Sequence, residues 1–163
     1  MDMVKLNDDR TFYNNQGNEL TDYPTFGAPV FAPCSGVIAT VVDSIEDIDP
    51  SLTASNLDNP AGNYIALRYA DSTYVILAHL KLGSTKVLPG DSVITGQHIA
   101  DVGNSGNTTW PHLHIHVQNL PEIDFDAQSG IPFRFKRMNR KRWFNNKEVE
   151  NAVLLRNDVF SNL

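Results

Sequence analysis

Three histidines occupy alternate positions of one short stretch, and this pattern constrains the fold more than any other feature of the sequence. His112, His114 and His116 are separated by single apolar residues. Alternation with a period of two is what a half-buried β-strand requires, so the three imidazoles are predicted to share one face of a strand. Neighbours two residues apart lie roughly 6.6 Å apart along a strand. Two of these rings are therefore close enough to serve one metal ion, or a metal ion and the substrate beside it.

The grouping of these histidines predicts a functional site. An isolated histidine is more often a satisfied core or surface residue than a ligand, and His98 is interpreted as a surface residue of this kind. Three imidazoles on one face cost desolvation, and they repel one another if they become charged, so an ordinary core has no reason to contain them. His116 has two open interpretations, as a residue that supports the site or as a plain strand residue.

Short β-prone runs separated by Gly and Pro turns predict an all-β fold. The segments 26–42 and 87–103 share one pattern of Gly-bearing turns and short apolar runs, and each is predicted to form a hairpin. Residues 63–69 are predicted to be a strand, and residues 74–80 its antiparallel return. The dense spacing of strands and turns indicates a mainly antiparallel sheet or flattened barrel with long loops.

Length and composition predict one domain over residues 1–163. A chain of 163 residues with 41% hydrophobic content can bury a core. Its core is placed at about 26–118, with a loop insertion at 43–62 and a C-terminal extension at 121–163. Within the extension, residues 131–135 are expected to return to the sheet, followed by a short helix or a strand. Cys34 is the single cysteine, and its turn-like surroundings indicate a structural role rather than a nucleophile.

The sequence as given shows no sign of membrane insertion, export or nucleic-acid binding. No apolar run approaches eighteen residues, and the start lacks the basic and apolar regions of a signal peptide. The net charge is −6, although residues 134–142 carry six of the thirteen basic residues and no acid. A short basic run on an acidic body is usually a solvated face, so nucleic acid is not favoured as a partner. Nothing in the sequence indicates an oligomeric state.

Several motifs together resemble those of the M23 family of zinc metallopeptidases, of the lysostaphin and LytM type. They lie between about residues 26 and 118, in the family's own order. The motifs are Gly-x-Pro-Val-x-Ala-Pro at 27–33, Tyr-x-x-x-Ala-His-Leu at 74–80, Pro-Gly-Asp-x-Val-x-x-Gly-Gln at 89–97, Gly-Asn-Ser-Gly at 103–106 and Pro-His-Leu-His at 111–114.

The resemblance implies a zinc-dependent endopeptidase that cleaves peptide cross-links of bacterial peptidoglycan on an antiparallel β fold. Carried over by position, His114 resembles a Zn²⁺ ligand, and Asp2 fits the setting of the family's metal carboxylate. His112 and His79 resemble the catalytic pair that flanks the attacked carbonyl. The family works outside the cytoplasm, so an extracellular or cell-envelope location is expected.

These residue types suit hydrolysis by a metal-activated water. Neutral imidazole and carboxylate ligands leave one position open on a tetrahedral zinc ion, and the pKa of a water bound there falls to about 7. An imidazole beside the ion can take the proton of that water or stabilise the oxyanion.

The start of the chain departs from the family pattern. The family's first zinc ligand is a histidine four residues before the metal carboxylate, which here falls outside the chain, and no histidine precedes His79. Three explanations are open: a start site placed too late, a truncated chain, or a natural domain that has lost its metal site. With two ligands rather than three, zinc affinity and hydrolysis are expected to be impaired, unless His112 or His79 turns inward to complete the ligand set.

Two other classes of function are considered. The first is a metal-poor, non-catalytic domain of the same fold that binds cell-wall peptide or a protein partner. The second is a biotinyl or lipoyl carrier domain, whose hairpins are similar. A carrier needs a lysine at a hairpin tip, and none occurs between Lys5 and Lys81, so the carrier interpretation is set aside.

Overall fold

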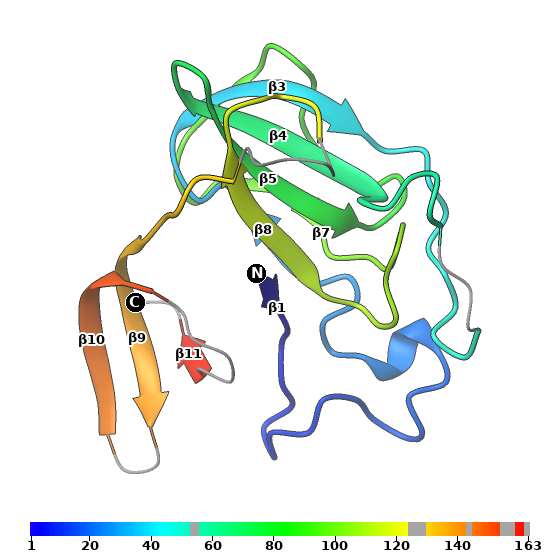
Figure 1. The fold of residues 1–163 in the computed structure, drawn as a ribbon. Coiled ribbons are helices and arrows are strands. Elements are labelled where there is room, and N and C mark those ends of the chain that lie inside the picture. Colours follow the sequence, from blue (N-terminus) through cyan, green and yellow to red (C-terminus); the bar gives the residue numbers. More distant parts are fainter. Residues whose placement is uncertain (53–55, 124–129, 143–144, 154–158, 162–163) are drawn as a thin grey trace. The chain divides into compact units, whose positions relative to one another are not determined.

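The computed structural model describes residues 1–52, 56–123, 130–142, 145–153 and 159–161, and divides the chain into two compact units, 1–130 and 131–163. Almost all of its regular structure is β-strand, in antiparallel pairs (Figure 1). The predicted all-β, mainly antiparallel fold class is therefore confirmed. The elements of unit 1 are β1 (Asp2–Met3), the short 3₁₀ helix η1 (Leu20–Asp22), β2 (Pro29–Phe31), β3 (Gly36–Val42), β4 (Asn63–Ala70), β5 (Thr73–Leu80), β6 (Ser92–Val93), β7 (His98–Asp101) and β8 (Leu113–Gln118).

A six-stranded sheet forms the body of unit 1, with strand order β1-β8-β5-β4-β3-β6. The predicted hairpin at its centre is confirmed, since β4 and β5 pair antiparallel across the turn at Asp71 and Ser72. The histidine-rich stretch forms β8, which pairs with β5 on one side and β1 on the other. Strand β8 thus lies between two neighbours, which hold its side chains in a fixed register.

The two segments that share a sequence pattern pair with each other, so the prediction of a local hairpin within each was wrong. In segment 26–42, β2 pairs with β7 and β3 pairs with β6, and both partners come from segment 87–103. Strand β3 also pairs with β4 in the large sheet. A local hairpin would pair β2 with β3 directly, whereas this exchange places β3 in the large sheet and β2 in a separate two-stranded sheet with β7.

The histidines share one face of the large sheet, and buried aliphatic residues of β5 and β8 lie on the other. Leu77 of β5 faces Ile115 of β8, and both are buried with less than 4% of their surface exposed. On the opposite face, Ala78 lies directly beside His114 in the neighbouring strand. Small buried residues lie near the histidines, namely Ala61, Ala66 and Ala78, which cluster with Ile76 and pack against the larger Tyr64 and Tyr74.

The expected loop insertion at 43–62 contains no strand among its described residues, and residues 53–55 of it lie outside them. It is fixed to the following segments by polar contacts rather than by a sheet. Asp47 accepts a hydrogen bond from the backbone N–H of Asn104 at 2.6 Å, and the side chain of Asn63 exchanges hydrogen bonds with the backbone of Ile45. Burial raises the pKa of Asp47, although the hydrogen bonds that it accepts from the backbone N–H groups of Asn104 and Leu82 act in the opposite direction.

Unit 2 is a three-stranded antiparallel sheet with the order β10-β9-β11. Its strands are β9 (Phe135–Arg142), β10 (Asn145–Ala152) and β11 (Val159–Ser161), so of the two alternatives for the extension, a strand is correct. The expected return of residues 131–135 to the large sheet is wrong, because β9 pairs with β10 and β11.

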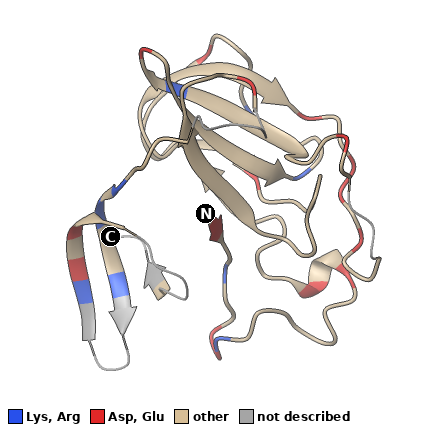
Figure 2. Ribbon diagram, in the orientation of Figure 1, with Lys and Arg blue, Asp and Glu red and all other residues tan. Residues whose placement is uncertain are grey.

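The basic run of unit 2 lies opposite acidic residues. Figure 2 shows basic residues on β9 and both acidic and basic residues on β10; Glu150 pairs with Arg137 in register, and Arg137 also contacts Glu148 at 3.6 Å. The exclusion of nucleic acid and the single-domain assignment both stay predictions. In the described part of the chain, no helix is long and apolar enough to cross a membrane.

Candidate metal and catalytic site

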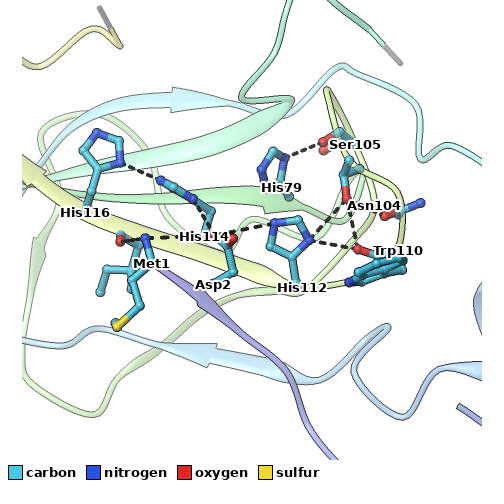
Figure 3. A network of polar contacts seen from close by, with 11 residues as sticks. Met1, Asp2, His79, Asn104, Ser105, Trp110, His112, His114 and His116 are labelled. Carbon is cyan, nitrogen blue, oxygen red and sulfur yellow. Dashed lines mark hydrogen bonds and ion pairs between the residues drawn. The ribbon is translucent and has the colours of Figure 1, made fainter. Parts of the chain in front are cut away.

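Pairing of β1 with β8 brings the start of the chain to the histidines. In this pair Asp2 faces His114, so the two side chains leave the sheet on the same side. The Asp2 Oδ1 atom lies 2.7 Å from His114 Nδ1 and 3.8 Å from His112 Nε2 (Figure 3). The two residues predicted as metal ligands are thus in direct contact.

A β-bulge turns His79 toward the same site. Across β4 and β5, Asn63 faces Leu80 and Tyr64 faces Ala78, which leaves His79 as an extra, unpaired residue. Its φ of 59° lies in the left-handed region, which is uncommon outside glycine and typical of strained functional positions. The ring centroid of His79 lies 4.6 Å from that of His112 and 5.9 Å from that of His114. Bulges commonly re-aim a side chain in this way.

Backbone carbonyls fix the protonated nitrogen of two of these rings. His79 Nδ1 lies 2.9 Å from the carbonyl oxygen of Ser105, and His112 Nδ1 lies 2.9 Å from that of Trp110. Because a carbonyl only accepts, we assign the proton of each neutral ring to Nδ1. The Nε2 atoms of His79 and His112 then have free lone pairs.

Burial keeps the imidazole rings of His79 and His114 neutral. It lowers the pKa of His79 to about 4, an effect that the neighbouring His112 reinforces. Burial also lowers the pKa of His114, although the hydrogen bond with Asp2 opposes this. Partial burial would raise the pKa of Asp2, but the hydrogen bond with His114 and the nearby ring of His112 outweigh it and lower that pKa. At neutral pH Asp2 is therefore a carboxylate and the rings of His79 and His114 are uncharged, which are the forms that bind metal ions.

The donors fit a zinc ion in chemical type but not in number. Asp2 Oδ1 and His114 Nδ1 are a carboxylate oxygen and an imidazole nitrogen, both common zinc ligands. Catalytic zinc sites in proteins take three such ligands. Among the residues that the structure describes, no three His, Cys, Asp or Glu side chains are arranged to hold a metal ion as they stand.

A small cavity of about 220 Å³ opens beside these rings. His79, His114 and His116 form one part of its wall, and the rest is formed by apolar residues such as Ala61 and Ala78 together with the polar Asn107. A space of this size next to unprotonated ring nitrogens can accept a small group of a bound peptide.

Sequence reasoning missed the residues that orient His79 and His112, the predicted catalytic pair. Ser105 belongs to the Gly-Asn-Ser-Gly motif at 103–106, but that motif did not predict that the Ser105 carbonyl oxygen would accept a hydrogen bond from His79. Trp110 contacts His112 through its backbone, and its ring packs edge-on against Phe12 at 5.5 Å. The contact with Phe12 has no signal in the sequence, because the two residues are 98 positions apart.

The other two residues singled out in the sequence have different surroundings. His98 lies in β7, where its Nε2 atom contacts Asp101 Oδ1 at 2.8 Å, and its side chain is 37% exposed. Burial raises the pKa of the Cys34 thiol, which keeps it in the unreactive protonated form. His98 thus belongs to the two-stranded sheet of β2 and β7, whereas β8 belongs to the six-stranded sheet.

Replacement of Gly62 by Ala should destabilise the chain by about 1–3 kcal/mol or more and disturb the orientation of His79. Gly62 has a φ of 60°, and an added Cβ would overlap the backbone of Ser105, whose carbonyl binds His79. Urea denaturation measures the loss of stability. Gly83 is the matched control, since its φ of 69° is similar but an added Cβ meets nothing within 4 Å. Equal losses at Gly62 and Gly83 would contradict the proposed clash.

Comparisons with known proteins extend this description. The family model described as "Peptidase family M23" matches residues 16–127. An "Uncharacterized metalloprotease" of Haemophilus influenzae is 32% identical over 88 residues, which is 54% of this chain and 15% of that protein. The chain thus spans about 15% of the length of this curated relative.

Two solved structures are similar at low TM-scores. The catalytic domain of the antimicrobial peptidase lysostaphin from Staphylococcus simulans is 23% identical, with 74% of this chain and 84% of that chain covered and a TM-score of 0.47. A zinc containing peptidase from Vibrio cholerae is 29% identical, with 59% and 24% covered and a TM-score of 0.44.

Proposed function

The chain belongs to peptidase family M23, and from this we propose that it is a zinc-dependent endopeptidase that hydrolyses peptide bonds in bacterial cell-wall peptidoglycan. Its substrate would be a peptide cross-link, met outside the cytoplasm or in the cell envelope. The metalloprotease relative supports the use of a metal.

The observation that carries this proposal is the convergence of three strands on one small site. Strand β1 supplies Asp2, β8 supplies His114 with His112 just before it, and the bulge in β5 supplies His79. Segments far apart in the sequence thus bring a carboxylate and three imidazoles together beside a cavity that His79 and His114 line. An ordinary core would not accept the desolvation cost of such a cluster.

In this proposal Asp2 and His114 hold zinc, and His79 and His112 handle protons. Zinc, when bound, lowers the pKa of a water molecule and polarises a carbonyl. The Nε2 atoms of His79 and His112 have free lone pairs, so either ring can accept a proton from an attacking water. The ring that has gained the proton can then donate it to the developing oxyanion or to the leaving amine. The hydrogen bonds from Nδ1 to Ser105 and Trp110 hold both rings in the required orientation.

One observation favours a second candidate function, a non-catalytic domain that binds cell-wall peptide or a protein partner. The described residues offer two adjacent metal donors rather than three. This chain should accordingly bind zinc more weakly than a three-ligand site, and its hydrolytic activity should be impaired to the same degree.

Zinc affinity and peptidoglycan hydrolysis, measured on the same purified chain, test the proposal. With zinc supplied, the chain should release new amino ends from purified peptidoglycan. His114→Ala should abolish this release and weaken zinc binding by at least about tenfold, because it removes one of two donors. His98→Ala, in the other sheet, is the matched control and should change neither. Absence of hydrolysis at saturating zinc would refute the peptidase and favour the binding domain.

A further inference from the structure

A row of hydrogen bonds runs along β8 behind the proposed ligand His114. His114 Nε2 lies 3.0 Å from His116 Nδ1, and His116 Nε2 lies 2.8 Å from Gln118 Oε1. The three residues alternate along one strand, so their side chains stand side by side on one face. At its other end the row meets Asp2, 2.7 Å from His114 Nδ1 (Figure 3).

Gln118 fixes the direction of this row. Its side chain is 1% exposed, and its Nε2 donates to the carbonyl oxygens of Leu120 and Glu122, each at 2.7 Å. A flipped amide would place its oxygen against these two carbonyls, which also only accept, so the flip is excluded. The Oε1 atom therefore faces His116, and His116 Nε2 must donate to it.

The bond at Gln118 also determines which ring nitrogen of His116, and then of His114, carries the proton. In a neutral imidazole one nitrogen donates and the other accepts. Because His116 Nε2 donates, its Nδ1 accepts, and the donor for that bond is His114 Nε2. His114 Nδ1 is then left with a lone pair that points at the Asp2 carboxylate.

With both rings neutral, the row has fewer protons than contacts. It contains three contacts, and both of its ends, Gln118 Oε1 and the Asp2 carboxylate, are acceptors. Two neutral rings carry two protons, which satisfy two of the three contacts. In the remaining contact, between His114 Nδ1 and Asp2 Oδ1, both atoms then have lone pairs; a third proton on His114 Nδ1 makes this contact a hydrogen bond, and a cation between the two atoms also satisfies it.

We propose that His116, oriented by Gln118, is a positioning residue that holds His114 with Nε2 protonated and Nδ1 open toward Asp2, ready for a divalent cation. This inference rests on the proposed metal-dependent function and deepens it. Ligating histidines commonly donate their second ring N–H to a fixed acceptor, which orients the ring and makes the other nitrogen a better ligand. Here that acceptor is another histidine.

The contacts of His116 also separate its role from those of the other histidines. Both of its ring nitrogens bind side chains of this strand. It therefore has no free nitrogen for a metal ion or a substrate, although its ring lines the cavity. His79 and His112 each keep Nε2 free.

Two substitutions at position 116 distinguish the effect of the hydrogen bonds of His116 from the effect of its side-chain volume. In His116→Gln, the amide oxygen can accept from His114 Nε2 while the amide nitrogen donates to Gln118 Oε1, which preserves the direction of the row. In His116→Leu, the acceptor is lost and only bulk remains. His98→Leu removes a histidine of the other sheet and is the matched control.

The experiment adds Zn²⁺ alone to the full chain and follows the ring nitrogens by NMR up to millimolar metal. In the unsubstituted chain, zinc should shift His114 Nδ1 while Nε2 keeps its proton. His116→Leu should weaken zinc binding by about 10–100-fold. His116→Gln should stay within about threefold of the unsubstituted chain, as should His98→Leu.

Two results would overturn the inference: unchanged zinc affinity in His116→Leu, or no zinc-dependent shift at His114 in the unsubstituted chain. If His116→Leu does not fold, His116→Gln decides the question alone: zinc affinity weakened by about tenfold or more in a folded His116→Gln chain would overturn the inference, because this variant preserves the row. None of these readouts uses hydrolysis. Zinc binding that depends on His116 in a chain that cleaves nothing would refute the peptidase and leave this inference intact.

Discussion

Replacement of His112 by Asn should lower kcat for peptide-bond hydrolysis by about 10²–10⁴-fold, with little change in KM or in bound zinc. The same result is expected for His79→Asn. Each substitution removes a ring whose Nε2 faces the site, and neither removes a proposed metal ligand. Asn also tolerates the left-handed backbone that His79 adopts. Steady-state kinetics on a zinc-saturated chain, with zinc content measured in parallel, checks this.

The double variant tests whether the two rings act together. Residues that act as one catalytic unit show losses that do not add, so His79→Asn with His112→Asn should cost about as much as one substitution alone. His98→Asn is the matched control. Independent, additive losses would contradict a shared role, and unchanged kcat in either single variant would remove that residue from the proposed catalytic pair.

Acidification should destabilise the metal-free chain by roughly 3 kcal/mol between pH 7 and pH 4, because His79 is buried in its neutral form. Its pKa is about 4 in the folded chain, against 6.5 for an ordinary histidine. Between these values the unfolded chain binds more protons than the folded one. The free energy of unfolding therefore falls as the pH falls through this window and levels off below the folded pKa. The lowered pKa of His114 acts in the same direction.

Urea denaturation at a series of pH values, with a chelator present, measures this dependence. In His79→Asn most of the fall between pH 7 and pH 4 should disappear, since Asn does not titrate. In His98→Asn the fall should remain. A pH dependence that is the same in His79→Asn and in the unsubstituted chain would show that His79 is not the group responsible.

Local patterns predicted the elements whose partners are close in the chain. The alternation of histidines with apolar residues predicted β8, and the short turn at 71–72 predicted the hairpin of β4 and β5. Both features depend on the period of two along a strand and on the chemistry of a tight turn, which neighbouring residues decide. The motifs that resemble family M23 named the residues that lie together.

Long-range pairing was not predicted where two similar segments could exchange partners. Segments 26–42 and 87–103 each have the composition of a hairpin, and their residues fit a local or an exchanged pairing equally well. The exchange is decided by which arrangement fits the whole sheet, a property of the complete chain. The direction of the hydrogen-bond row at His116 was hidden for the same reason, because it depends on carbonyls at Leu120 and Glu122.

The sequence by itself determined that His112, His114 and His116 stand on one face of a strand, because alternation is a local property of the chain. Only the tertiary structure decided that His79 joins them. Regular alternation in β5 would place His79 on the opposite face from Ala78, and a bulge with a φ of 59° reverses this. It also decided that Asp2 lies beside His114, since the pairing of β1 with β8 joins residues 112 positions apart.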